Sequence, residues 1–437
     1  MKRPRLGASA GLVLALGATG IGSTPPAAAA DDPAAADRIH ATDGTAAAPE
    51  GAARDVVRHL DLRRWSTGGA WRTGRREGVR VAAAAIRIDH RIGIRRYADP
   101  WGDGDPHRYG FARWTSRWIR PGFGLTELIP SWNATTPRHT WIELAVRGRT
   151  GSGATGSWDV LGRWAAGDRS FHRASPSRQP DDFSRVNVDT LVTDAHRRYA
   201  AWQLRVTLLR RVGATASPTV RSAGAIASRV PRGGTVHASA TTMRRTVELD
   251  VPRWSQMVHE GEYPQYDGGG EAWCSPTSVA MVLGYWHRLP KPRQYAWVND
   301  AYPAPWVDHG ARYAYDYRYE GAGNWPFNTA YAGTLGVDAY VTRLRSLRPA
   351  ERLIRHGIPL VASIAFGPGE LDGAPLESSP GHLLVIRGFT RDGRVIVNDP
   401  AADHARGVRR VYKRRQFENV WLPTTGGTVY VLRGGPS

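Results

Sequence analysis

The chain has little cysteine and little lysine. Its 437 residues include a single cysteine, Cys274, which excludes an intramolecular disulfide framework. Lys2, Lys291 and Lys413 are the only lysines among 59 basic residues, so the formal net charge of +20 comes almost wholly from scattered arginines. No nucleic-acid-binding motif accompanies that charge. We therefore expect no nucleic-acid partner, and an anionic wall or membrane surface suits the positive field better.

The first 30 residues have the pattern of a secretory signal peptide. A basic start, Lys2–Arg5, precedes the apolar stretch Leu6–Gly22, and small residues continue to Ala30. Residues 31–54, rich in alanine, aspartate and proline, are expected to be a disordered leader. Later in the chain there is no apolar run of the about 20 residues that a membrane span requires. The sequence predicts an exported protein, secreted or associated with the cell wall.

Two domains are expected, because the chain is longer than one hydrophobic core usually serves. Residues 55–228 contain short β-branched and aromatic runs separated by turn residues, a pattern typical of an antiparallel β-sandwich, here of unknown role. Residues 229–246 are expected to form a linker. The expected strands are Val79–Arg87, Trp141–Arg147, Trp158–Trp164, Ser184–Val192, Trp202–Leu209 and Thr219–Ala227.

Residues 247–437 have a different pattern, with helical spacing first and strands later. That order predicts an α+β domain. The aromatic stretch Tyr295–Trp325 is expected to be a long lid-like loop, in preference to a cleft lining. The expected helices are Ser278–His287, Phe327–Leu335 and Pro349–His356, and the expected strands are Pro359–Phe366, Leu383–Phe389, Arg394–Asn398 and Gly427–Leu432.

Cys274 precedes the first expected helix, with Pro276 in its first turn. Unsatisfied N–H groups and the helix dipole at such a position stabilise a thiolate, the nucleophilic form of cysteine. A nucleophilic cysteine needs a base, usually histidine. Of 14 histidines, His382 stands out because it heads an apolar strand. An inert buried thiol and a structural histidine are the alternatives.

The strand after His382 ends in an acceptor pair, Asn398 and Asp399, either of which can orient an imidazole. A two-residue turn at Asp392 and Gly393 would place Ile386 opposite Asp399, about 13 Å along the strand from His382. A four-residue loop would instead place His382 directly opposite Asp399 on the same face. We expect the second register.

Four motifs occur in order along the chain: Gln256 ending Val-Pro-Arg-Trp-Ser-Gln, Cys-Ser-Pro-Thr-Ser from Cys274, Gly-His-Leu-Leu-Val around His382, and Val-Asn-Asp-Pro around Asp399. Together they resemble cysteine peptidase family 39 over residues 249–432. The resemblance implies a papain-like fold. It also implies that Cys274 is the nucleophile, His382 the general base and Asp399 the residue that orients the imidazole. Gln256 and the backbone N–H of Cys274 would form the oxyanion hole, and no metal or organic cofactor is implied.

The chain departs from that family in three places. Ser275 follows the cysteine where the family commonly has glycine, and bulky Trp273 before it is expected to narrow the cleft. Gln256 lies 18 residues before Cys274, a wide interval for papain-like sites. Gln265, nine residues before the cysteine, is therefore a competitor for the oxyanion role.

The sequence thus predicts a secreted thiol peptidase that acts on peptides or proteins through a Cys-His-Asp triad. One alternative is a hydrolase or amidase of the same nucleophile class that cuts the peptides of peptidoglycan. The other is a non-catalytic wall- or glycan-binding protein with a degenerate peptidase domain.

Overall fold

The computed structural model describes residues 57–176, 179 and 182–434, which belong to one compact unit. The expected signal peptide, residues 1–30, and leader, residues 31–54, lie outside the described residues. Within the described part of the chain, none of the helices combines the length and apolar character that a membrane crossing requires.

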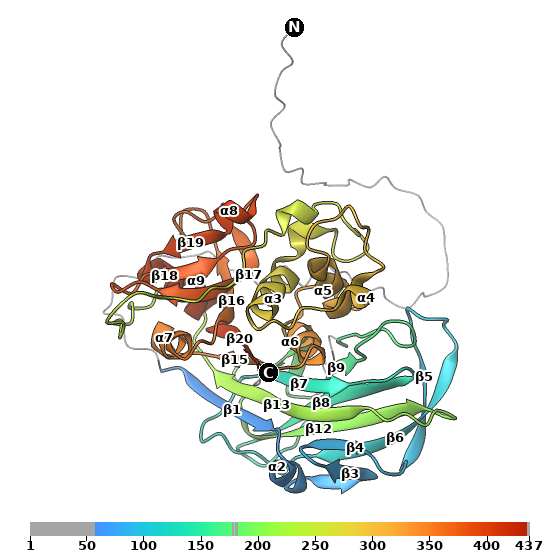
Figure 1. The fold of residues 1–437 in the computed structure, drawn as a ribbon. Coiled ribbons are helices and arrows are strands. Elements are labelled where there is room, and N and C mark those ends of the chain that lie inside the picture. The colour runs from blue at the N-terminus through green and yellow to red at the C-terminus, as the bar shows by residue number, and fades with distance from the viewer. Residues whose placement is uncertain (1–56, 177–178, 180–181, 435–437) are drawn as a thin grey trace, which may run out of the picture. The chain divides into compact units, whose positions relative to one another are not determined.

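Two antiparallel sheets make up the N-terminal lobe, residues 57–229 (Figure 1). In the first, the strand order is β10-β11-β7-β13-β4-β3, with β1 on β13; in the second it is β2-β6-β12-β8-β9, with β5 on β6. The first sheet contains β1 (His59–Trp65), β3 (Val79–Ala82), β4 (Ala85–Ile88), β7 (Glu127–Thr135), β10 (Ser184–Asn187), β11 (Thr190–Thr193) and β13 (Thr219–Arg229). The second contains β2 (Arg75–Glu77), β5 (Gly93–Ala98), β6 (Pro106–Thr115), β8 (Thr140–Thr150), β9 (Asp159–Trp164) and β12 (Tyr199–Arg211), and the short helix α2 (Gly68–Arg72) follows β1.

Two of the strands expected in this lobe are hairpins. The expected strand Val79–Arg87 is divided into β3 and β4 by a turn in which Ala83 has φ 49°. The expected strand Ser184–Val192 is divided into β10 and β11 at Val188, whose φ is 51°. Tight hairpin turns need positive φ, which glycine or asparagine usually supplies. Because alanine and valine occupy the positive-φ positions of these turns, those positions carry no turn signal.

The C-terminal lobe, residues 247–434, combines one antiparallel sheet with helices (Figure 1). The strand order is β15-β20-β16-β17-β18-β19, with β14 on β17. The strands are β14 (Val247–Glu248), β15 (Val337–Arg343), β16 (Leu360–Phe366), β17 (Ser379–Phe389), β18 (Val395–Asn398), β19 (Arg409–Tyr412) and β20 (Thr428–Gly434). The helices are α3 (Cys274–Tyr285), α4 (Pro292–Tyr295), α5 (Trp306–Ala314), α6 (Trp325–Thr334), α7 (Leu347–Arg355), α8 (Ala405–Val408) and α9 (Arg414–Thr425), and two 3-10 turns are η1 (Met257–His259) and η2 (Gly270–Ala272).

The stretch Tyr295–Trp325 is not the long lid-like loop that the sequence suggests, because it contains helix α5. Val307 and Ala311 of α5 are fully buried against Trp273, in a small apolar cluster of their own. Many aromatic residues flank α5 in the sequence. They obscure the helical periodicity of its short apolar stripe, so the sequence pattern does not predict the helix. The helix matters because it packs against α3, which carries Cys274 at its start.

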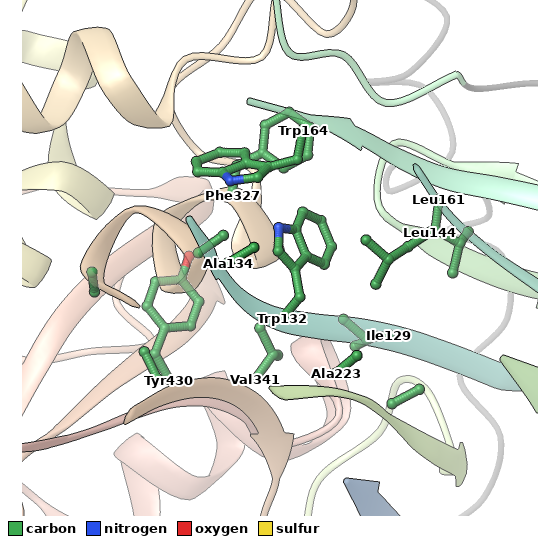
Figure 2. Packing of buried hydrophobic residues seen from close by; sticks show 14 of the residues in the cluster. Ile129, Trp132, Ala134, Leu144, Leu161, Trp164, Ala223, Phe327, Val341 and Tyr430 are labelled. Carbon is green, nitrogen blue, oxygen red and sulfur yellow. The ribbon is translucent and has the colours of Figure 1, made fainter. Parts of the chain in front are cut away.

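The two lobes share one apolar core. Phe327 of α6 packs edge-on against Trp132 of β7, with ring centroids 5.9 Å apart, and lies tilted against Trp164 of β9, with ring centroids 5.3 Å apart (Figure 2). The side chain of Asn133 forms two hydrogen bonds with the buried backbone of β15. Its amide N–H donates to the Ala339 carbonyl at 2.6 Å, and its carbonyl oxygen accepts from the Ala339 N–H at 3.0 Å. Buried polar groups need such partners, so each lobe completes the interior of the other.

A buried ion pair also connects the lobes. Glu127 of β7 forms an ion pair with Arg343 of β15, whose side chain is fully buried, and accepts a hydrogen bond from Arg232 at 2.8 Å. Burial alone would raise the pKa of Glu127, but the two guanidinium groups outweigh it and lower the pKa to about 2. The carboxylate is therefore charged throughout the physiological range.

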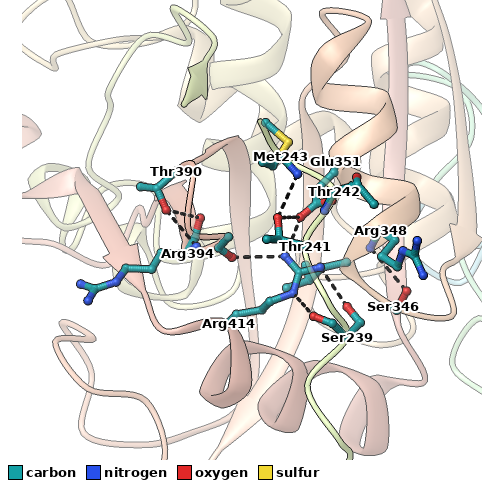
Figure 3. A network of polar contacts seen from close by, with 12 residues as sticks. Ser239, Thr241, Thr242, Met243, Ser346, Arg348, Glu351, Thr390, Arg394 and Arg414 are labelled. Carbon is teal, nitrogen blue, oxygen red and sulfur yellow. Dashed lines mark hydrogen bonds and ion pairs between the residues drawn. The ribbon is translucent and has the colours of Figure 1, made fainter. Parts of the chain in front are cut away.

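The segment between β13 and β14 is fastened along helices α7 and α9. Thr242 donates to Glu351 of α7 through its N–H at 2.8 Å and its hydroxyl at 2.6 Å (Figure 3). Arg414 of α9 donates to the same Glu351 and to the carbonyl and hydroxyl of Ser239. Residues 229–246, the expected linker, thus make specific contacts with the C-terminal lobe.

Candidate active site

Cys274 is the first residue of helix α3. Trp273 occupies the N-cap position, and Pro276 lies in the first turn, where its missing N–H is not needed. Helix α3 is buried over most of its length, while Cys274 itself is only partly buried and forms no disulfide. The thiol therefore lies at the positive end of a rigid core helix, with the unpaired N–H groups of the first turn nearby.

His382 lies near the start of β17 and is buried, with 2% of its surface exposed. Its Nε2 is 2.7 Å from Oδ1 of Asp399. The other ring nitrogen, Nδ1, is not used by Asp399, and the Cys274 side chain lies close enough to contribute to the raised pKa of His382. One turn into α3, the Ser278 hydroxyl donates to the Leu383 carbonyl at 3.1 Å and fixes the helix on the strand beside the imidazole.

The β17–β18 hairpin has neither of the two registers considered from the sequence. Phe389 pairs with Val395 and Ile386 with Val397, with a bulge between Ile386 and Gly388 that adds Arg387 to one strand. The expected direct pairing of His382 with Asp399 is therefore wrong. The last pair is Val385 with Asn398, so Asp399 lies diagonally across from His382 on the same face. Long side chains reach one another across such a diagonal, which explains the hydrogen bond.

Asp399 is buried and has three hydrogen-bond donors. Besides the imidazole of His382, the Tyr412 hydroxyl donates to Oδ2 at 2.7 Å, and the Ala401 N–H donates to Oδ1 at 3.2 Å. Burial by itself would raise the pKa of Asp399, but the charge of His382 and these hydrogen bonds outweigh burial and lower it. No motif in the sequence includes Tyr412, which comes from β19.

Asn398, the alternative orienting residue, has other partners. Its amide donates to the Pro252 carbonyl at 2.8 Å, and its carbonyl oxygen accepts from Arg387 at 3.0 Å. These contacts hold the segment that leads to Gln256. Of the two candidates, Asp399 is the one hydrogen-bonded to His382.

Gln256 and Gln265 differ in burial. Gln256 is buried, and its amide donates to the carbonyl of Glu271, three residues before Cys274, at 2.5 Å. Gln265 is exposed. The Gln256 amide has two N–H groups. One donates to the Glu271 carbonyl, and the other is not used by that hydrogen bond. Gln256 is thus the glutamine whose amide lies beside the segment that leads into the thiol.

Two neighbours of the thiol point into the protein. Trp273 is fully buried, and its Nε1–H donates to the Tyr266 carbonyl at 2.6 Å, so its indole packs beneath the site and not in a cleft. Ser275 is also buried and its hydroxyl lies 3.0 Å from that of Tyr430. The two departures from the family pattern are therefore accommodated in the interior.

The surroundings of His382 favour its charged form. Burial would lower the pKa of the imidazole, but the Asp399 carboxylate, with a further contribution from Cys274, outweighs burial and raises the pKa to about 10. At neutral pH the ring is therefore an imidazolium. A positive charge beside a sulfur stabilises the thiolate, so the arrangement suits an ion pair.

Comparisons with known proteins identify the family of both lobes. Residues 61–228 match the family model described as the peptidase C39 N-terminal domain, and residues 248–429 match the model described as the peptidase C39-like family. A solved structure from Bacillus anthracis, named as a candidate C39-like peptidase, has 16% identity, covers 44% of this chain and 99% of its own, and superimposes with a TM-score of 0.28. The comparison with curated proteins gave no match.

Proposed function

We propose that this chain, which belongs to the C39-like peptidases and carries their N-terminal domain, is a thiol peptidase that cleaves peptide bonds through an acyl-enzyme. The hydrogen bond between His382 and Asp399, beside the Cys274 thiol at the start of α3, is the observation that supports this function most strongly. A nucleophile, a base and a group that orients the base are the minimum set for covalent acyl transfer.

In the proposed reaction, the Cys274 thiolate attacks the carbonyl carbon of the substrate. A C–S bond forms, and the carbonyl π electrons move to oxygen. The backbone N–H of Cys274 and the second amide N–H of Gln256 donate to that oxyanion. When the tetrahedral intermediate collapses, the C–N bond breaks and the His382 imidazolium gives its proton to the leaving amine. Neutral His382 then takes a proton from water, whose oxygen attacks the thioester, and the thiolate leaves.

Asp399 holds the imidazole through Nε2, so Nδ1 is the ring nitrogen left to serve the sulfur in the proposed reaction. Its negative charge also stabilises the imidazolium that the resting ion pair requires. In papain-like enzymes, a helix that begins with the nucleophile comes first in the chain. A sheet follows, with the histidine on one strand and the carboxylate after the next strand, and this chain has the same order. We extend the proposal to that fold for residues 247–437 and, from the pattern of residues 1–30, to an exported protein.

A cell-wall peptide is a second candidate substrate. It is favoured by the net charge of +20, which attracts the protein to anionic wall polymers. The same thiolate would then hydrolyse the peptide cross-links of peptidoglycan. The non-catalytic alternative, a wall- or glycan-binding protein, requires that the site be inactive.

Mass spectrometry of a proteome-derived peptide library tests the peptidase proposal. We expect new peptide termini after incubation with the wild type and none with Cys274→Ser, which keeps the shape of the side chain and lacks a thiolate. Parallel incubation with purified peptidoglycan measures release of wall peptides. Cleavage of neither substrate, or equal cleavage by both forms of the protein, would contradict the function.

A further inference from the structure

A second group of ionisable side chains lies buried beside Trp273. His259 ends the 3-10 turn η1, Glu262 follows three residues later, and Asp308 is in the first turn of α5. His259 and Asp308 are completely buried, and Glu262 has 6% of its surface exposed. Nδ1 of His259 lies 2.7 Å from Glu262 and 3.5 Å from Asp308, and the three ligand-type atoms all fall within 4.8 Å of one another.

This group is poorly neutralised by the protein. Three of its buried polar atoms have no hydrogen-bond partner among the described residues: both carboxylate oxygens of Asp308, and Nε2 of His259. The ion pairs that Glu262 and Asp308 form within the described chain involve His259 alone, without arginine or lysine. The adjoining side chains are apolar, since Trp273 and Val307 belong to the cluster beside them. Two carboxylates in such surroundings are costly unless a cation or a proton compensates them.

The geometry points to a cation. We propose that His259, Glu262 and Asp308 bind one divalent transition-metal ion, of the class of Zn²⁺, inside the C-terminal lobe. Two ligands about 2.1 Å from a tetrahedral ion lie about 3.4 Å apart, close to the 3.5 Å between His259 and Asp308, whereas Glu262, which lies 2.7 Å from Nδ1, would move back by about 0.7 Å on binding. The two carboxylates balance a charge of +2. An imidazole ligand favours Zn²⁺ over Ca²⁺ and Mg²⁺, which prefer oxygen ligands only.

The ion would stabilise the segment that carries Gln256. The N–H of His259 donates to the Gln256 carbonyl at 3.0 Å, and its ring lies 6.0 Å from that of Trp273, next to Cys274. Gly270 approaches His259 so closely that an added Cβ would lie 2.3 Å from the His259 carbonyl carbon. A metal bridge from η1 to α5 therefore fixes the turn behind the thiol. The ligand set is separate from the triad, so metal binding does not depend on the peptidase function.

Binding is tested on the full chain with Cys274→Ala, so that the thiolate cannot capture the probe. After treatment with a chelator and removal of the chelator, Zn²⁺ is added, the protein is desalted, and native mass spectrometry counts bound metal. We expect one equivalent. Glu262→Gln and Asp308→Asn should each weaken Zn²⁺ binding by more than about 100-fold. The exposed pair Asp103 and His107, 2.8 Å apart, provides the control: Asp103→Asn should leave the bound equivalent in place.

X-ray absorption on the zinc-loaded wild type gives a readout that does not need a folded variant. We expect nitrogen and oxygen neighbours at about 2.0–2.2 Å and no sulfur. Absence of bound Zn²⁺, loss of the bound equivalent in Asp103→Asn, or a sulfur neighbour at about 2.3 Å would each overturn the proposal.

Discussion

The backbone N–H of Gln256 donates a hydrogen bond to the carbonyl of Pro400, with a distance of 2.8 Å. Pro400 directly follows Asp399, so the residue proposed to stabilise the oxyanion is fastened to the residue that holds the imidazole. In the same segment, the Ser255 hydroxyl donates to the Ala402 carbonyl. The two sides of the candidate site, more than 140 residues apart in the chain, are thus locked to each other through the backbone.

Gln256→Ala is expected to lower kcat by about 100- to 1,000-fold, the usual cost of removing one donor to an oxyanion. KM should change little, because the interaction forms mainly in the transition state. Steady-state kinetics on a peptide substrate measure both. Gln265→Ala, the same change at an exposed position, is the matched control and should retain wild-type rates. A large loss in the control with none in Gln256→Ala would transfer the role to Gln265.

Tyr412→Phe removes the hydroxyl that donates to Asp399. Hydrogen bonds to buried charges contribute about 1.5–3 kcal/mol, so we expect kcat/KM to fall by about 10- to 100-fold through misplacement of the imidazole. The alkaline limit of the pH–rate profile should shift as well, which a purely structural defect would not cause. Tyr285→Phe removes a hydroxyl bonded to the Gly357 carbonyl and serves as the control. Identical profiles for both variants would remove Tyr412 from the site.

Glu127→Gln is expected to destabilise the fold by about 3–5 kcal/mol, because it leaves the buried guanidinium of Arg343 without its counter-charge. The folded pKa of Glu127, about 2, is below its ordinary value of 4.5, so its contribution is complete above pH 4.5 and disappears as the pH falls through about 2. Urea unfolding at several pH values measures the difference from wild type, which should shrink in acid.

The control for this comparison is Glu77→Gln. Glu77 pairs with Arg75, whose side chain is 77% exposed, and such surface pairs contribute less than about 1 kcal/mol. Equal destabilisation by the two substitutions would show that Glu127 does not connect the lobes through a buried ion pair.

Local signals in the sequence indicate much of the site. A proline in the first turn places Cys274 at a helix start. His382 stands out because it is a polar residue at the start of an apolar strand. The contact between His382 and Asp399 was expected, but the pairing that produces it was not. A bulge at Arg387 depends on where this guanidinium finds its acceptors, and one of them, the Leu249 carbonyl, lies 138 residues away in the chain.

The features that the sequence does not predict also depend on tertiary contacts. Tyr412 belongs to no motif, since its role exists only where β19 brings the hydroxyl to Asp399. Strand β7 contains Pro130, which argues against a central strand, yet Trp132 and Asn133 fill the space between the lobes. His259 and Asp308 are almost 50 residues apart, and only the packing of α5 brings them together.

Alkylation of Cys274 by iodoacetamide as a function of pH tests the ion pair most directly, because it needs no substrate. The proposed pair sets an imidazolium, whose pKa is about 10, beside the sulfur, so the wild-type rate should stay nearly constant from pH 6 to pH 9. In His382→Ala the rate should instead rise about tenfold per pH unit below about 8.5, as for an ordinary thiol. A wild-type rate that follows the same rise as His382→Ala, or a thiol that fails to react in the native protein, would contradict the Cys274–His382 pair.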